Sequence, residues 1–159
     1  MSTTIGSIIT AESAAAFRRG HRGRVISPGD EGYDTARAVW NGMIDRRPAL
    51  IARCADTADV VAAVRFAREQ GLGVAIRGGG HNAAGLAVAD GALVVDLAAM
   101  NAVEVDPQRR IARAGGGATW GGFDAATQAH GLATTGGAIS TTGIAGLTLA
   151  GGIGYRRPP

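Results

Sequence analysis

Arg77-Gly78-Gly79-Gly80-His81-Asn82 follows directly on the apolar run Val74-Ala75-Ile76. Three consecutive glycines allow positive φ angles and let backbone N–H groups converge on an anion, so a strand ending in this loop indicates a phosphate-facing turn. The loop is not a dinucleotide-fold fingerprint, because its glycines are adjacent and no helix pattern follows them. Two interpretations stay open from these residues alone: a loop that holds a ligand, or a tight turn with a structural histidine.

The residues before the loop predict a βαβ unit. Pro48 to Cys54 has the pattern of a short buried strand, and a helix pattern follows that Asp56 or Thr57 can cap and Gly71 ends. The apolar stripe of this helix is predicted at Val60, Val61, Val64 and Ala67. The strands on either side of the helix should be parallel, with a right-handed crossover. The glycine loop then lies at the carboxyl end of a strand, where ligands bind in open α/β sheets.

Residues 1–27 are predicted to be a lead-in to the domain. They contain the basic run Arg18 to Arg24, which is either a binding tail or, as we expect, a solvated segment. The run is no twin-arginine export signal, because charged residues and glycine follow it in place of an apolar stretch. A turn at Ser27 to Asp30 and a helical segment from Tyr33 to Trp40 come next.

Beyond the loop, the pattern changes to short β-rich runs at Ala92 to Leu97, Ala102 to Val105 and Arg110 to Ala114. The short breaks between these runs predict an antiparallel meander. Thr119 to His130 has the pattern of an amphipathic helix that Gly131 ends. The last tract, Thr134 to Gly154, is rich in glycine and threonine. It is either a surface for a flat or phosphorylated ligand or a pair of tight turns.

All 16 basic residues of the chain are arginine. The absence of lysine excludes a Walker-type phosphate loop and Schiff-base chemistry. The formal net charge is only +3 and the arginines are scattered along the chain, so we expect no nucleic-acid binding.

Cys54 is the single cysteine, so no intrachain disulfide can form, and His21, His81 and His130 stand far apart in the sequence. These residues predict no metal site, and any cofactor should be organic. The N-terminus has no basic segment followed by an apolar core, and no apolar run is long enough to span a bilayer. We therefore expect a cytoplasmic protein without a membrane partner.

Four segments carry a family resemblance: the two glycine tracts, Gly115-Gly116-Gly117-Ala118-Thr119-Trp120, and Tyr33 to Gly42. Together they resemble the flavin-binding domain of the p-cresol methylhydroxylase (PCMH) and vanillyl-alcohol oxidase superfamily, in its berberine-bridge-enzyme-like branch. The resemblance implies an α+β fold, with an N-terminal βαβ subdomain followed by part of a second α+β subdomain with mainly antiparallel strands. This PCMH-type FAD-binding domain would occupy residues 28–159 and be truncated at its C-terminus, with the family's substrate domain absent.

The resemblance also implies the cofactor, FAD, and its contacts. In the family, the loop matching Arg77 to Asn82 embraces the pyrophosphate, and the histidine in the place of His81 is commonly bonded to the 8α carbon of the flavin ring. Many members have a second link to a cysteine, but Ile139 stands at that position here, so a monocovalent link through His81 is expected. The residues implied to bind the cofactor are Arg77, Gly78, Gly79, Gly80, His81, Asn82, Gly85, Thr141, Thr142, Gly143, Gly146, Gly151, Gly152 and Gly154. Asp96 also matches a family pattern, although a strand-end aspartate that satisfies nearby backbone is an equally good interpretation.

The implied activity is hydride transfer from an alcohol- or amine-bearing carbon of a small molecule to flavin N5, with reoxidation by dioxygen or another acceptor. Relatives are much longer and supply the usual base from their C-terminal segment, so no catalytic residue is identified and this chain alone should be catalytically incomplete. A second chain or a missing C-terminal region would complete the site. Two alternatives remain: a stand-alone flavin-binding module without turnover, and an Arg-rich polyanion-binding protein with coincidental glycines.

Overall fold

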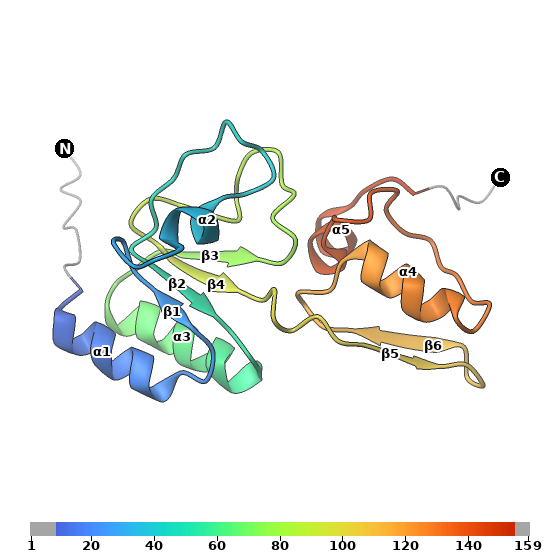
Figure 1. Cartoon of the computed structure of the whole chain (residues 1–159), viewed down its shortest axis with the longest axis horizontal. Coiled ribbons are helices and arrows are strands. Elements are labelled where there is room, and N and C mark those ends of the chain that lie inside the picture. Colours follow the sequence, from blue (N-terminus) through green and yellow to red (C-terminus); the bar gives the residue numbers. More distant parts are fainter. Residues whose placement is uncertain (1–8, 155–159) are drawn as a thin grey trace.

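The computed structural model describes residues 9–154; residues 1–8 of the expected lead-in and residues 155–159 of the expected domain lie outside the described residues. Figure 1 shows two parts that follow one another along the long axis of the molecule, which we call the sheet half (residues 9–97) and the hairpin half (residues 98–154). The sheet half contains α1 (Ala11–Gly20), β1 (Val25–Ile26), α2 (Tyr33–Arg37), β2 (Leu50–Arg53), α3 (Thr57–Glu69), β3 (Val74–Arg77) and β4 (Leu93–Asp96). The hairpin half contains β5 (Val103–Asp106), β6 (Ile111–Ala114), α4 (Trp120–Gln128) and α5 (Ile144–Ala150). The predicted α+β class is confirmed.

The sheet half is built on a four-stranded sheet in the order β1-β2-β4-β3. The strands β2, β4 and β3 run parallel, and β1 pairs antiparallel with β2 at one edge. The prediction that the two strands flanking α3 are parallel is confirmed. They are not neighbours, however, because β4 lies between them.

The position of β4 corrects the expected antiparallel meander. Leu93, Val94 and Val95 are almost fully buried, and all four residues of β4 are buried in succession. Burial on both faces is typical of a central parallel strand and not of a half-exposed hairpin strand. The chain returns from β3 to β4 through residues 78–92, a helix-free connection long enough for a parallel crossover. The strands β5 and β6 do form an antiparallel pair, as predicted.

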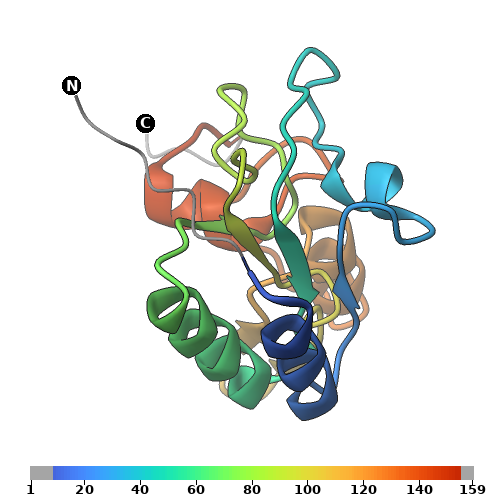
Figure 2. The ribbon, with the colours of Figure 1, turned by 90° about the vertical axis from the view of Figure 1, so that its left-hand side faces the viewer.

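Helix α1 corrects the expectation of a solvated lead-in. It lies beside α3 (Figure 2), where buried Phe17 stacks on Phe66 of α3 with ring centroids 4.3 Å apart. His21, which follows the helix, is buried as well. The basic run conceals this packing in the sequence, because Arg18 and Arg22 are solvated on the outside of the same segment while Phe17 faces the core. Residues 11–26 therefore pack as part of the sheet half.

Helix α3 begins and ends as predicted, but its buried face differs from the predicted stripe. The Asp56 side chain caps it by accepting a hydrogen bond from the N–H of Asp59 at 3.0 Å, and Gly71 follows its end with φ +63°. The buried residues of the helix are Asp59, Ala63, Phe66 and Ala67. Val61 and Val64 stay 43% and 46% exposed. The stripe is rotated because Asp59 faces inward, where its carboxylate accepts backbone hydrogen bonds.

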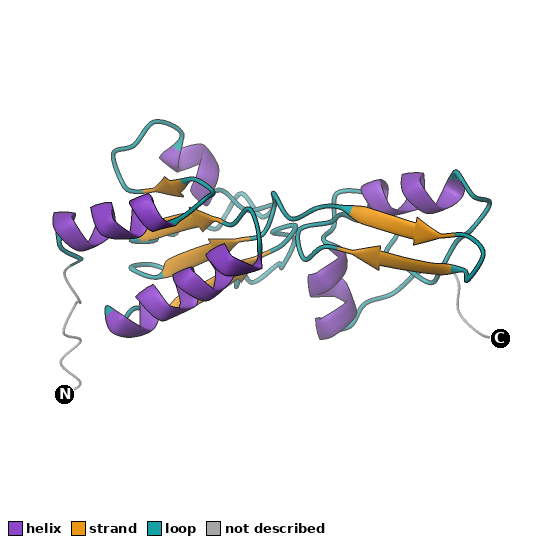
Figure 3. Cartoon of the chain, turned by 90° about the horizontal axis from the view of Figure 1, so that it is seen from below, coloured by secondary structure: helices purple, strands orange, loops and turns teal. Residues whose placement is uncertain are grey.

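The hairpin half lies end to end with the sheet half (Figure 3) and carries one unpredicted helix. The helix predicted from Thr119 to His130 is confirmed as α4, with Gly131 at φ +65° after it. Within the glycine- and threonine-rich tract, Ile144–Ala150 forms α5, for which Gly143 is the N-cap. Glycine costs about 1 kcal/mol relative to alanine inside a helix, so its abundance masked this short helical segment.

Candidate cofactor-binding site

The carboxyl ends of the three parallel strands bring Arg53, Asp96 and Arg77 into register. Asp96 is 1% exposed and accepts a hydrogen bond from Arg77 Nη2 at 2.6 Å, while Arg53 Nε lies 3.4 Å from the same oxygen. Its other oxygen accepts a hydrogen bond from the N–H of Ala98 at 3.1 Å. The backbone role considered for Asp96 is therefore present, together with a buried ion pair that the sequence analysis did not predict.

Arg77 joins the start of the glycine loop to the segment after α2. Besides Asp96, its guanidinium donates hydrogen bonds to the carbonyl oxygens of Ala36 and Ala38, the latter at 3.3 Å. The side chain is buried, so these partners occupy it within the protein. Its predicted contact with the cofactor stays a prediction.

The three glycine tracts meet in space because their residues lack side chains. A Cβ at Gly79 would overlap the backbone nitrogen of Gly143, and a Cβ at Gly143 would overlap the nitrogen of Gly79. At Gly78, a Cβ would lie 3.0 Å from the carbonyl oxygen of Gly116. Gly80 has φ +69°, a conformation that glycine adopts without steric cost. The loop therefore packs directly against the backbone of the hairpin half.

His81 follows this contact and is held at both edges and on one face. Thr141 Oγ1 lies 2.9 Å from its Nε2, and Thr142 Oγ1 lies 3.4 Å from its Nδ1. The Trp40 indole stacks on the imidazole, with ring centroids 5.2 Å apart and planes 23° from parallel. Because a hydroxyl can donate or accept, the two threonines can satisfy the protonated and the unprotonated nitrogen of a neutral imidazole.

A hollow of about 380 Å³, which we call the first hollow, opens beside the loop. Its volume is in the range of small-molecule and cofactor pockets. The sheet half contributes Ile76, Gly78, Gly79, Gly80, His81, Asn82, Ala83, Leu86 and Ala87, and the hairpin half contributes Thr142, Gly143, Gly146, Leu147, Ala150 and Gly151. The hollow thus combines bare backbone, hydroxyl and imidazole groups with apolar side chains from both halves.

Most of the predicted cofactor residues come together at the first hollow. They are Gly78, Gly79, Gly80, His81, Asn82, Thr142, Gly143, Gly146 and Gly151. Asn82 also accepts hydrogen bonds from the N–H groups of Ala84 and Leu86 through its side-chain oxygen, which shapes the turn after the histidine. The sequence therefore placed distant residues in one site, although their contact with FAD stays a prediction.

A second hollow of about 420 Å³ lies at the same loop. It is lined by Thr35, Ala38, Val39, Trp40, Arg53, Arg77, Gly78, Gly79, Gly80, His81, Asp96, Ala98 and Thr141. Two of the predicted cofactor residues, Arg77 and Thr141, thus line the second hollow and not the first. His81 lies at both.

Three predicted cofactor glycines line neither hollow, and each is explained by packing. Gly85 has φ +72°, and a Cβ there would lie 2.7 Å from the Ile44 side chain. A Cβ at Gly152 would overlap Leu147, and one at Gly154 would overlap the carbonyl oxygen of Gly136. Gly85, through its positive φ, and Gly154, through its backbone contact, therefore require glycine whether or not a cofactor is bound, whereas a side chain at Gly152 would displace the Leu147 side chain.

The aromatic and apolar part of the site was not predicted from the sequence. Trp40 belongs to a segment that resembles the family, and its position before Asn41-Gly42 marks an aromatic next to a turn. Nothing in the sequence places it against His81. Leu86 and Leu147 line the first hollow from two separate segments, and only the fold brings them together.

Cys54, the last residue of the segment predicted as a buried strand, lies in the buried core. Burial raises the pKa of its thiol to about 12. Among residues 9–154, no three His, Cys, Asp or Glu side chains gather in a way that could hold a metal ion. The same part of the chain contains no helix that is long and apolar enough to cross a membrane.

These features define a cofactor-binding domain in which glycine backbones from two subdomains meet beside a histidine. The chain belongs to the FAD binding domain family, whose model matches residues 48–159.

Relatives of known name are oxidases and FAD-linked oxidoreductases, in agreement with this family. The chain is 41% identical to (R)-6-hydroxynicotine oxidase of Paenarthrobacter nicotinovorans over 137 residues. This alignment covers 86% of this chain and 30% of the relative. Over 130 residues, it is 36% identical to the FAD-linked oxidoreductase hasG of Aspergillus fumigatus, covering 82% of this chain and 28% of the relative.

Solved structures agree as well. The crystal structure of 6-hydroxy-D-nicotine oxidase from Arthrobacter nicotinovorans matches with a TM-score of 0.83 at 41% identity, over 85% of this chain and 30% of the other. The Physcomitrella patens BBE-like 1 structure matches with a TM-score of 0.81 at 31% identity, over 90% of this chain and 31% of the other. The chain thus spans about 30% of the length of these relatives.

The comparisons confirm the predicted family and the PCMH-type fold. The chain is an FAD-binding domain of the kind found in FAD-linked oxidoreductases, and its relatives are enzymes.

Proposed function

We propose that this chain holds FAD in the first hollow, with the loop Gly78–Gly80 binding through its backbone and His81 forming a covalent link. One observation carries this proposal. The mutual contact of Gly79 and Gly143 sets His81 between Thr141 and Thr142, at the rim of a hollow lined by glycine backbone. The contact depends on bare backbone, because a side chain at Gly79 or Gly143 would force the two walls apart. Bare glycine backbone also lets N–H groups approach an anionic group such as the pyrophosphate of FAD.

His81 would form the link through a neutral ring nitrogen. The nitrogen would bond to the 8α carbon of the flavin, and the imidazole and that carbon would each release one proton. The two electrons released would reduce the flavin ring, and dioxygen would reoxidise it with formation of hydrogen peroxide. Thr141 and Thr142 support this role because their hydroxyls contact both ring nitrogens and fix the orientation of the imidazole. No cysteine stands at position 139, so the link would be to His81 alone.

When bound, the flavin would supply a hydride acceptor, its N5 atom, for an alcohol- or amine-bearing carbon of a small molecule. The electrons would then pass to dioxygen or another acceptor. This chain's residues would bind and orient the cofactor for that reaction. The substrate wall and the base would come from further polypeptide or from a second chain. A module that binds flavin without turnover would have the same site and differ in substrate-dependent bleaching without oxygen.

The arrangement of arginines counts against polyanion binding. Several form ion pairs with aspartates, namely Arg18, Arg22, Arg37, Arg46, Arg47, Arg53 and Arg77. These pairs are spread over the sheet half and offset the charge locally. A polyanion site requires a cluster of cations on one face.

The test is intact-mass spectrometry of protein produced with ample riboflavin, followed by mapping of flavin-bearing peptides. We expect an added FAD mass on the peptide that contains His81. The variant His81→Ala should lose the covalent mass and still bind FAD reversibly. His130→Ala is the matched control, because His130 is exposed at the end of α4, and it should behave as the wild type.

Each alternative outcome is distinct. FAD attached to another peptide would refute the role of His81 and leave FAD binding intact. A wild-type protein that acquires neither covalent nor reversible flavin would refute FAD binding by this chain on its own.

A further inference from the structure

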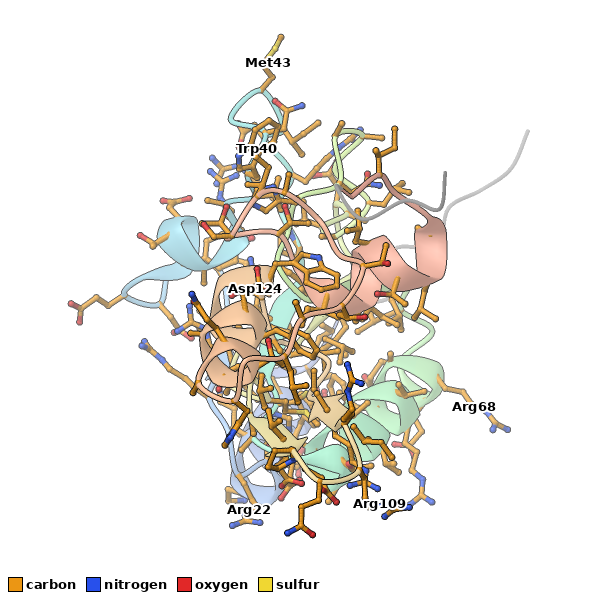
Figure 4. All side chains as sticks on the ribbon, turned by 90° about the vertical axis from the view of Figure 1, so that its right-hand side faces the viewer. Arg22, Trp40, Met43, Arg68, Arg109 and Asp124 are labelled. Carbon is orange, nitrogen blue, oxygen red and sulfur yellow. The ribbon has the colours of Figure 1, made fainter. Side chains whose placement is uncertain are left out.

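We infer that Trp40 is a positioning residue for His81, a role that rests on the proposed covalent attachment of FAD. Trp40 lies in the loop between α2 and β2, on the same excursion of the chain as Met43 (Figure 4). It is 65% exposed, yet its indole stacks on the imidazole.

Hydrogen bonds hold Trp40 and its neighbour Asn41 against the histidine loop. Its N–H donates to the carbonyl oxygen of Gly80 at 3.1 Å, directly before His81. The Asn41 side-chain amide donates to the carbonyl oxygen of Ala83 at 2.9 Å, two residues after His81. The Trp40 segment therefore runs along the histidine loop as a fixed neighbour.

The buried side chain of Arg77 also fixes this segment. The Arg77 guanidinium, held by Asp96, donates hydrogen bonds to the carbonyl oxygens of Ala36 and Ala38. Ala38 is two residues before Trp40. Arg77 is also the last residue of β3, from which the glycine loop starts. One buried ion pair thus ties together the two backbone segments that carry the rings of the stack.

The stack completes the restraint on the imidazole. Thr141 and Thr142 restrain the two nitrogens in the ring plane, but hydrogen bonds at the edges leave the ring free to tilt. The Trp40 indole closes one face against that tilt. Trp40 lines the second hollow and not the first, which is the proposed place of the flavin. We therefore expect Trp40 to act through His81 and not by touching the flavin.

The test separates positioning from cofactor contact by comparing Trp40→Ala, Trp40→Phe and the control Met43→Ala, a 91% exposed residue of the same loop. Reversible FAD affinity is measured by flavin fluorescence before the link forms, and the rate of linkage is measured as flavin that stays with the denatured protein. We expect Trp40→Ala to slow linkage about 10- to 100-fold, since misplaced reacting groups cost about that much, with the affinity unchanged. Trp40→Phe should restore most of the rate, and Met43→Ala should match the wild type.

A second readout needs no flavin. The ring current of the indole should shift the His81 ring protons in the NMR spectrum of the flavin-free protein, and Trp40→Ala should remove this shift. Unchanged linkage in Trp40→Ala, or a loss of reversible affinity as large as the loss of rate, would overturn the inference while FAD binding stands. A wild type without any flavin would overturn the proposed function, and this inference with it.

Discussion

The two halves of the molecule differ in how each one is packed internally. The sheet half has buried apolar clusters on both faces of its sheet, with the central strand β4 buried throughout. In the hairpin half, β5 and β6 are at most partly buried and α5 has no buried residue. The hairpin half reaches the site through glycine backbone and threonine hydroxyls.

This difference shows how the work of the site is divided. The sheet half fixes the position of His81, because the histidine follows β3 and the Arg77–Asp96 pair at the carboxyl edge of the sheet. The hairpin half supplies the partners that turn the imidazole, Thr141 and Thr142. The site therefore exists only where the two halves meet. Substitutions in the core of the sheet half should lower the free energy of unfolding, whereas substitutions at the contact between the halves should weaken cofactor binding.

Asp96→Ala should strongly lower the stability of the sheet half. It leaves the buried Arg77 guanidinium without its carboxylate, and removal of one partner from a buried ion pair costs about 3–5 kcal/mol. The measurement is the free energy of unfolding from urea titration. The control is Asp90→Ala, whose partner Arg46 is exposed, and it should cost about 1 kcal/mol or less. Equal losses in the two variants would show that the Asp96 pair does not hold this half together.

Gly79→Ala should affect the contact between the halves. The new Cβ would overlap Gly143, and such overpacking costs about 1–3 kcal/mol. Since each 1.4 kcal/mol is tenfold in affinity, FAD should bind about 5- to 150-fold more weakly, measured by flavin fluorescence. Amide hydrogen exchange of β2 and β4 should not change.

The control for this variant is Gly20→Ala, at the end of α1, where a Cβ would meet nothing within 4 Å. It should bind FAD as the wild type does. If Gly79→Ala also bound FAD normally, the contact between the halves would not shape the site.

The predictability of the molecule from its sequence also differs between the halves and the site. Helix ends could be predicted, because Asp56, Gly71 and Gly131 act through local backbone geometry. The place of β4 could not, because strand order depends on which buried strands pair across long loops. The inward turn of Asp59 was hidden for a similar reason, since its hydrogen-bond donors Arg22 and Gly23 lie far away in the sequence.

The candidate site divides along the same line. His81 and most of the predicted glycines were recognisable from motifs that resemble a family, and these residues do come together at the first hollow. The stack of Trp40 on His81 was not predictable, because it depends on how a long loop folds back over the sheet. The Arg77–Asp96 pair was hidden because the two residues meet only once β3 and β4 are neighbours.

Asp59 should make the stability of the sheet half depend on acid. Burial alone would raise the pKa of its carboxyl, but hydrogen bonds from the backbone N–H groups of Ala55, Arg22 and Gly23, and the nearby His21, bring it below its ordinary value of 3.8. A folded pKa below the unfolded one gives stability that is fully present above the unfolded value and is lost as pH falls through the folded pKa. The stability gap between the wild type and Asp59→Asn, measured by urea titration, should therefore be constant near neutral pH and narrow below about pH 3.8. A gap that stays constant down to pH 2 would contradict the lowered pKa.

Val64→Ala should have the smallest effect, although it removes two methyl groups from an apolar helix. Val64 is 46% exposed on the outer face of α3, and alanine has the higher helix propensity, so the free energy of unfolding should change by no more than about 0.5 kcal/mol. Phe66→Ala on the same helix should cost about 3–5 kcal/mol, because Phe66 is buried against Phe17. The two variants together measure which way α3 is rotated in solution. A cost above about 1 kcal/mol for Val64→Ala would contradict this orientation, because it would show that the Val64 side chain packs against another part of the protein.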